Sequence, residues 1–201
     1  MEKTIISPLD PSPDEYNIAA MLSVSTREQI MALQDKIKTI LGDTVWLMPP
    51  QCLHSTLMEI IWRTEYATLS RRQHFKKWYD SHHQTTKEII ASHNPFTVRF
   101  TELYASPGAI IIKAENTHEY NAIRHELLTH TQLPEGTKLP PTIVHSSIAR
   151  YAKSVDVGEV QWAIKHLAVD ITESLTCFKL VTDLVPPASA AKTLETYRLG
   201  A

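Results

Sequence analysis

Two short segments of the chain combine a histidine with hydroxyl side chains inside an apolar run, LHSTL at 53–57 and VHSSI at 144–148. Each run is predicted to be a strand, over 53–61 and 143–151. Side chains two positions apart on a strand point to the same face, and those between them point to the other face. The histidine and hydroxyl residues that share a face are therefore His54 with Thr56, and His145 with Ser147.

These four side chains form a set that can cleave a phosphodiester without a metal ion. One neutral imidazole removes a proton from the attacking water or hydroxyl, and the other, protonated, donates a proton to the leaving oxygen. Histidine suits both tasks because its pKa lies near neutral. Hydroxyl groups donate hydrogen bonds to phosphate oxygens, where charge accumulates in the transition state. We therefore predict His54 and His145 as the catalytic pair, and Thr56 and Ser147 as phosphate-binding residues.

The pattern histidine, any residue, serine or threonine is weak by itself, because the ten histidines of the chain should give one or two matches by chance. A third match occurs at His83-Gln84-Thr85. It lies in a polar stretch without flanking apolar residues, and we interpret it as a solvated helix face. Apolar flanks and strand periodicity distinguish the other two matches.

The two halves of the chain resemble each other at a fixed, ungapped offset of 91 residues. Each half reads as a strand, a capped helix, a Pro-Pro pair and a strand that bears the histidine. This repeat predicts a duplicated unit whose two histidine strands lie side by side about a pseudo-two-fold axis, with a groove between them. The aligned residues are Thr26 with Thr117, Glu28 with Glu119, Pro49-Pro50 with Pro140-Pro141, and His54-Ser55 with His145-Ser146.

Apolar periodicity and turn residues outline the remaining elements. The helices are predicted after a capping box at 25–28, over 65–92 with a break near 82–83, after an N-cap at 116–119, and over 156–168. The other strands are predicted at 17–24, 45–48, 96–101, 109–114, 174–184 and 194–199. Residues 1–14 are interpreted as a tail. No stretch is rich enough in Gly, Ser or Pro to separate independent domains, so residues 1–201 are expected to form a single domain.

Composition narrows the function. A net charge of −2 argues against a protein that grips long nucleic acid through many phosphate contacts, but it permits a small nucleotide or an RNA end. No apolar run approaches the roughly 18 residues of a membrane span. The N-terminus lacks the layout of a signal peptide. The cysteines at 52 and 177 are far apart in sequence, which favours a reduced, cytoplasmic protein.

The paired motifs, with Ala149-Arg150-Tyr151 after the second, resemble those of the 2H phosphoesterase superfamily, which includes the 2′-5′ RNA ligase-like proteins and the cyclic phosphodiesterases. The resemblance extends over most of residues 16–199. It implies an α+β, bilobal fold in which two antiparallel sheets form a central groove and helices pack outside. It also implies metal-independent chemistry on 2′,3′-cyclic phosphates, 2′-5′ linkages or related nucleotide phosphodiesters. In that reading His54 and His145 are catalytic.

Several alternatives stay open. Tyr151 would share a strand face with His145 and is a candidate for stacking on a base, while packing in the core is at least as good an explanation. The chain is expected to act as an enzyme on a nucleotide or RNA end, as a monomer, without cofactor, metal, membrane or extended DNA binding. A non-catalytic nucleotide- or RNA-end-binding module of the same fold is the alternative. A plain scaffold protein would place the two histidines far apart. Which histidine is the base is not determined.

Overall fold

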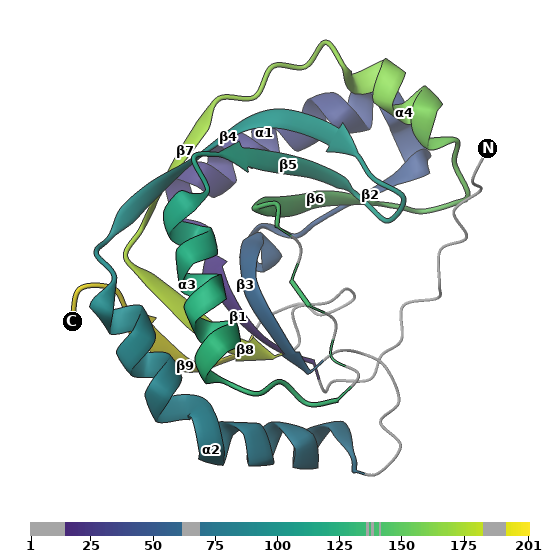
Figure 1. Cartoon of the computed structure of the whole chain (residues 1–201). Helices are drawn as coiled ribbons and strands as arrows, with labels where there is room; N and C mark the ends of the chain where they lie inside the picture. The colour runs from purple at the N-terminus through teal and green to yellow at the C-terminus, as the bar shows by residue number, and fades with distance from the viewer. Residues whose placement is uncertain (1–14, 62–68, 136, 138, 141, 183–191) are drawn as a thin grey trace.

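The computed structural model describes residues 15–61, 69–135, 137, 139–140, 142–182 and 192–201. Two antiparallel sheets curve around a common inner side, and the helices lie on their outer sides (Figure 1). The expected α+β fold with two antiparallel sheets and outer helices is confirmed. The tail predicted at 1–14 and the second proline of the pair at 140–141 lie outside the described residues.

The nine strands of the described residues divide between the two sheets. The first sheet has the order β3-β1-β8-β9 and the second has the order β2-β6-β5-β4-β7. The strands are β1 (Tyr16–Met21), β2 (Val45–Leu47), β3 (His54–Ile61), β4 (Phe96–Ala105), β5 (Ile110–Glu115), β6 (His145–Tyr151), β7 (Ile171–Leu175), β8 (Cys177–Thr182) and β9 (Lys192–Arg198).

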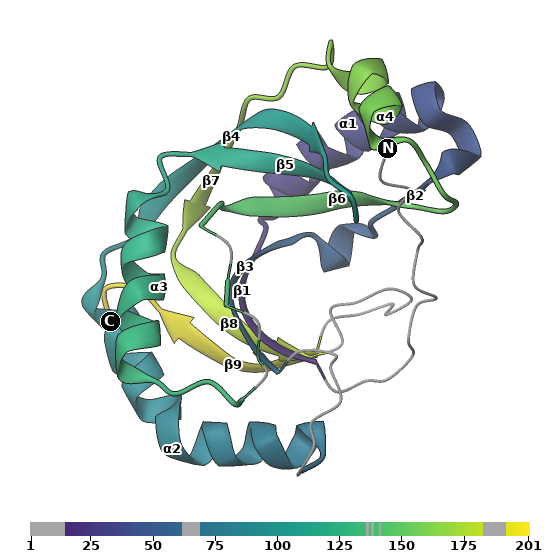
Figure 2. The same ribbon diagram turned by 45° about the vertical axis from the view of Figure 1, so that its right-hand side comes forward.

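The helices cover the outer sides of the sheets, α1 and α4 against the second sheet, α2 and α3 against the first (Figure 2). Buried apolar side chains from both sheets and all four helices form one continuous cluster. None of the helices described is both long enough and apolar enough to cross a membrane. The helices are α1 (Val24–Leu41), α2 (Arg71–Ser92), α3 (His118–His130) and α4 (Val157–Ile164), with short 3₁₀ turns at Gly42–Thr44 and Pro50–Cys52.

The structure carries the duplication that the repeat predicts. In the first half β1 pairs antiparallel with β3, and in the second half β5 pairs antiparallel with β6. Each sheet is completed by strands of the other half, because β2 joins the second sheet, and β8 and β9 join the first. The prediction of one continuous strand at 174–184 is wrong, because the described part of this stretch belongs to two strands, β7 and β8. The chain leaves the second sheet after Leu175 and enters the first at Cys177.

The helix boundaries correct two further predictions. The N-cap of α1 is Ser23, whose side chain accepts a hydrogen bond from the backbone N–H of Thr26, so the capping box predicted at 25–28 lies inside the helix. The hydroxyl of Ser23 also donates to Glu173 of β7 at 2.9 Å, which fixes the start of the helix against the second sheet. Helix α2 runs unbroken through His82 and His83, since neither residue interrupts helical hydrogen bonding.

Candidate active site

His54 and His145 occupy equivalent positions at the first residue of β3 and of β6, and both side chains are half-buried. The two strands belong to different sheets but lie in contact across the inner side (Figure 1). The imidazoles are close enough for the charge of His54 to lower the pKa of His145. The two histidines therefore lie near each other, whereas a plain scaffold protein would place them far apart.

Both histidine strands contain a β-bulge at the same position, three residues after the histidine. In β3 the pairing with β1 shifts between Ile18 and Ala19, which leaves Leu57 as the extra residue. In β6 the pairing with β5 shifts between Ile110 and Ile111, which leaves Ile148 as the extra residue. An extra residue reverses the in-and-out alternation beyond it. The first six residues of the two strands accordingly have the same burial pattern.

The bulge decides which side chains share the inner face with the histidines. Before it, the half-buried positions are those predicted, His54 and Thr56 in one strand and His145 and Ser147 in the other. After it, the half-buried position is the fifth residue beyond each histidine. In the first half this residue is Glu59, and in the second half it is Arg150.

Tyr151 is directed away from this face. Its side chain is only 3% exposed, and its hydroxyl donates a hydrogen bond to the carbonyl oxygen of Ser106 at 2.9 Å. A base has no access to a ring that is buried to this extent, so the structure favours the alternative given for Tyr151, packing in the core. The reason is the bulge at Ile148, because without it Tyr151 would share a face with His145.

Arg150 is the residue that sequence reasoning missed. Its positive charge lowers the pKa of both His54 and His145, which places the guanidinium within electrostatic range of the two imidazoles. Its Nη1 donates to the carbonyl oxygen of Gly108 at 3.4 Å. Strict alternation from His145 assigns Arg150, five residues later, to the opposite face. The sequence therefore gives no sign that the two side chains share a face until the bulge at Ile148 is known. A guanidinium within electrostatic range of two imidazoles is a group that can bind a phosphate strongly.

A second arginine, Arg124 of α3, connects the two histidine strands from behind. The side chain is buried, with 5% of its surface exposed. Its guanidinium donates to the carbonyl oxygens of Thr56 at 2.7 Å and Leu57 at 2.9 Å, at the bulge of β3. It also donates to the carbonyl oxygen of Ile143, two residues before His145, at 3.2 Å. One side chain therefore fixes the backbone on both sides of the site.

Gln34 of α1 has the corresponding position behind β6. Its side chain is 3% exposed, and its amide nitrogen donates to the carbonyl oxygens of Ile148 at 2.7 Å and Met48 at 2.8 Å. The bulge residue of each histidine strand is thus hydrogen-bonded to a buried polar side chain of a helix. In one half this side chain is neutral, and in the other it is a cation.

The two histidines differ in their own hydrogen bonds. Nδ1 of His54 lies 2.7 Å from the carbonyl oxygen of Cys52. Since a carbonyl can only accept, Nδ1 carries the proton, and Nε2 of the neutral ring is left as the basic nitrogen. The carbonyl of Ile143 has the same relation to His145 and opposes the lowering of its pKa. Nδ1 of His145 nevertheless makes no hydrogen bond of acceptable geometry to the described residues.

Burial is the main cause of the low pKa of both rings. The pKa of His54 is lowered by desolvation and by Arg150, against the supporting hydrogen bond to Cys52. The pKa of His145 is lowered to about 4 by desolvation, then by the charges of Arg124 and His54, with a smaller effect of Arg150. Positive charge on His145 is therefore opposed by three neighbouring cationic groups, and positive charge on His54 by one.

The third histidine motif lies elsewhere. His83 is on α2, where its ring stacks on Tyr79 and its Nδ1 lies 3.2 Å from the hydroxyl of Tyr197. The helical assignment is confirmed, but the residue is half-buried rather than solvated.

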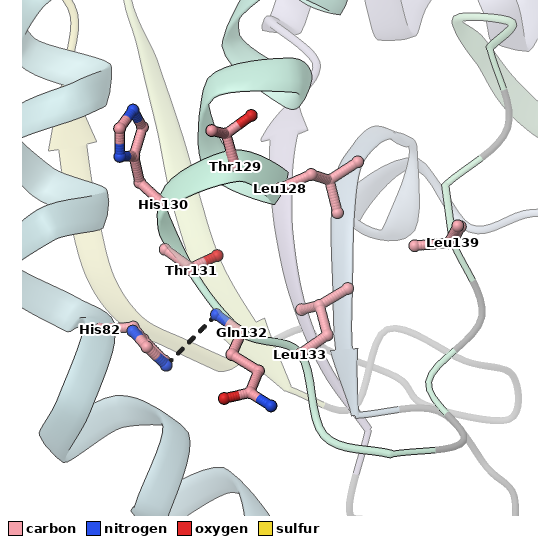
Figure 3. Close-up of a pocket in the computed structure, with 8 residues that line it drawn as sticks. All are labelled: His82, Leu128, Thr129, His130, Thr131, Gln132, Leu133 and Leu139. Atoms are coloured by element: carbon pink, nitrogen blue, oxygen red, sulfur yellow. Dashed lines mark hydrogen bonds between the residues drawn. The ribbon is translucent and has the colours of Figure 1, made fainter.

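A pocket of about 420 Å³ lies between α2 and the end of α3, and Figure 3 shows the residues that line it. It is lined by His82, Leu128, Thr129, His130, Thr131, Gln132, Leu133 and Leu139. The ring of His82 accepts a hydrogen bond there from the backbone N–H of Gln132 at 3.3 Å. None of the four predicted site residues lines this pocket, so it is not the candidate active site. In the part of the chain that the structure describes, no three His, Cys, Asp or Glu side chains gather as a metal-binding group.

Comparison with solved structures supports the fold. The chain is similar to TT0787 of Thermus thermophilus, with a TM-score of 0.68 and 18% identity over 93% of this chain and 98% of that one. It is similar to a protein described as a phosphoesterase, with a TM-score of 0.61 and 13% identity over 94% of this chain and all of the other. E. coli LigT, solved in complex with 3′-AMP, gives the same TM-score, identity and coverage.

No protein-family model and no curated protein sequence matches the chain. The likeness to the solved structures extends over nearly the whole length of both partners, and at these identities it is a likeness of fold. The chain therefore has the fold of these solved structures, and this agrees with the fold that the resemblance of the two histidine motifs implies.

Proposed function

We propose that the protein is a metal-independent phosphodiesterase that hydrolyses a 2′,3′-cyclic phosphate or a 2′-5′ phosphodiester of RNA or of a small nucleotide. The observation that carries the proposal is the pair of bulged strands, which present an imidazole and a hydroxyl each to one inner side. The electrostatic coupling of the two imidazoles supports it further. A monomer that acts in the cytoplasm on a nucleotide or an RNA end completes the proposal.

The surroundings of the histidines favour different roles for them. A neutral His145 is favoured because burial, and then the charges of Arg124, His54 and Arg150, oppose its protonation. His54 bears the single proton of the pair more readily, since the carbonyl of Cys52 accepts its Nδ1–H and stabilises the imidazolium. We therefore assign His145 as the general base and His54 as the general acid of hydrolysis.

The proposed reaction needs only the phosphodiester, one water molecule and the two histidines. A water oxygen attacks phosphorus while His145 takes a proton from the water, and the bond from phosphorus to the leaving ribose oxygen breaks as His54 gives up its proton. Thr56, Ser147 and Arg150 hold the non-bridging oxygens, whose charge increases in the transition state. The product is a phosphomonoester with a free hydroxyl, and proton exchange with solvent restores the two histidines.

The test is hydrolysis of 2′,3′-cyclic nucleotides in the presence of a metal chelator. We expect turnover by the wild-type protein and a loss of about 10²- to 10⁴-fold in kcat/KM for His54→Ala and for His145→Ala. His83→Ala is the matched control, because its histidine has the same local motif but lies on α2. Turnover that survives both active-site substitutions, or that requires a metal ion, contradicts the proposal.

The alternative, a binding module of the same fold, predicts a different outcome. Nucleotide monophosphates would bind to the wild-type protein, and no cyclic nucleotide, 2′-5′ oligonucleotide or RNA end would be hydrolysed. The intact pair of histidines and hydroxyls favours the enzyme.

A further inference from the structure

Trp46 lies beside the candidate site in a position that the core does not require. It is the central residue of β2, the edge strand of the second sheet. Its side chain is 37% exposed, whereas the neighbouring Val45 is 2% exposed and Trp78 of α2 is also 2% exposed. Tryptophan is highly buried on average, and this indole on a short edge strand is instead open to contact with a ligand.

The pairing of β2 with β6 determines which way this indole faces. Trp46 lies directly opposite Arg150 in the antiparallel register. Directly opposed residues of an antiparallel pair share a face, with Cβ atoms about 4.5–5.5 Å apart. Because the bulge at Ile148 turns Arg150 to the inner side, Trp46 is on that side too. The alternation of β2 agrees, since Val45 opposes the buried Tyr151.

Among the described residues, no side chain stacks on the indole of Trp46 or forms a hydrogen bond with it. Trp162 of α4 is still more exposed, at 71%, but the ammonium of Lys165 lies over its ring at 5.1 Å from the centroid. Helix α4 is moreover on the outer side of the second sheet (Figure 2). Of these two exposed indoles, Trp46 is the one beside the phosphate-binding arginine.

We propose that Trp46 is a specificity-determining residue that stacks on the nucleobase of the substrate. The inference rests on the proposed function, in which Arg150 holds the phosphate. Neighbouring strands are separated by about 4.8 Å, so a ligand whose phosphate lies at Arg150 can extend an adjoining flat ring over the next strand, where Trp46 stands. An indole face accepts any base, because every base has a π-face. The substrate class is therefore a phosphodiester that carries a nucleobase, not a base-free sugar phosphate.

The experiment compares two substrates that differ only in the base. One is a 2′,3′-cyclic nucleotide, and the other is the 2′,3′-cyclic phosphate of 1-O-methylribose. We expect Trp46→Leu to raise KM about tenfold for the nucleotide, which corresponds to about 1.4 kcal/mol, with kcat and the kinetics of the base-free substrate unchanged. Trp46→Phe keeps a flat ring and should retain most of the affinity.

The control variant is Trp162→Leu, which removes an exposed indole from the outer side. It should leave KM unchanged for both substrates. An equal change in KM for the two substrates with Trp46→Leu would mean that Trp46 supports the fold of β2 and does not contact a base. Unchanged KM for both substrates would also overturn the inference.

A binding measurement separates this inference from the proposed function. Adenosine 2′-monophosphate should quench the tryptophan fluorescence of the wild-type protein and should quench that of Trp46→Phe much less. If the wild-type protein hydrolyses neither substrate, the proposed function fails, yet this difference in quenching would still support stacking on Trp46. Equal quenching of the two proteins would refute it whether or not turnover is observed.

Discussion

Strands β3 and β6 share a bulge and a burial pattern but have different electrostatic surroundings. Both begin with the histidine, both have a bulge three residues later, and both bulges are held by a buried side chain of a helix. In β3 that side chain is the cationic Arg124, and in β6 it is the neutral Gln34. Beyond the bulge, β3 presents Glu59 and β6 presents Arg150.

This comparison shows how a duplicated unit can acquire two chemical roles. The duplication provides two imidazoles at equivalent positions, and identical surroundings would give them equal proton affinities. The cations are not distributed symmetrically, and they oppose the protonation of His145 more than that of His54. An acid and a base can therefore arise from one repeated motif by a few substitutions around it.

The largest expected difference between the two strands concerns the leaving group. His54→Ala removes the proposed acid, so its loss of kcat/KM should be about 100-fold smaller for a nitrophenyl phosphodiester than for a cyclic nucleotide, because nitrophenolate leaves without a proton. His145→Ala removes the proposed base and should lose activity to a similar degree on both substrates. Steady-state kinetics on the two substrates measure this, and the reverse pattern would exchange the two roles.

A smaller difference is expected in stability at acid pH. His145 has a pKa of about 4 in the folded protein, below its ordinary value, so the unfolded chain binds a proton that the folded protein does not bind between about pH 6.5 and 4. The free energy of unfolding should therefore decrease as the pH is lowered from about 6.5 to 4. In His145→Asn the fall should be smaller by roughly 1–2 kcal/mol, as measured by urea unfolding at both pH values. The control is His118→Asn, at an exposed position of α3. An equal fall in wild type and His145→Asn would contradict the low pKa.

The smallest expected effect is the contribution of the Arg124 charge to the low pKa of His145. The acid limb of the kcat/KM profile reports protonation of His145, and the alkaline limb reports loss of the proton from His54, so the optimum should lie between about pH 4 and 6.5. Removing the charge in Arg124→Met should raise the pKa of His145 and move the acid limb to higher pH by roughly half a unit.

Two variants test whether this shift is electrostatic. Arg124→Lys keeps the charge and should leave the limb in place. Gln34→Leu removes the equivalent contact behind β6 without a change of charge, and should lower stability while the limb stays where it is. A shift of the limb in Gln34→Leu as well would mean that backbone displacement, and not charge, sets the pKa of His145.

The sequence predicts the parts of the site that depend on local order. A period of two within an apolar run places His54 with Thr56 and His145 with Ser147, and the structure agrees because both pairs precede the bulge. The 91-residue offset predicts two equivalent strands, which the pairing of β1 with β3 and of β5 with β6 confirms. Predictions based on local periodicity fail where the backbone departs from it, and Tyr151 is the example.

Tertiary structure decides the remaining parts, for a physical reason. A bulge arises from the register between two strands, so the local sequence around Leu57 or Ile148 does not predict it. The carbonyl oxygens that bind Arg124 are separated from it by 19 to 68 residues of chain, so that interaction exists only in the folded protein. By itself the sequence determined two histidines and two hydroxyls on paired strands. Only the fold brought the two strands together, turned Arg150 inward with Trp46 beside it, and made the two histidines unequal.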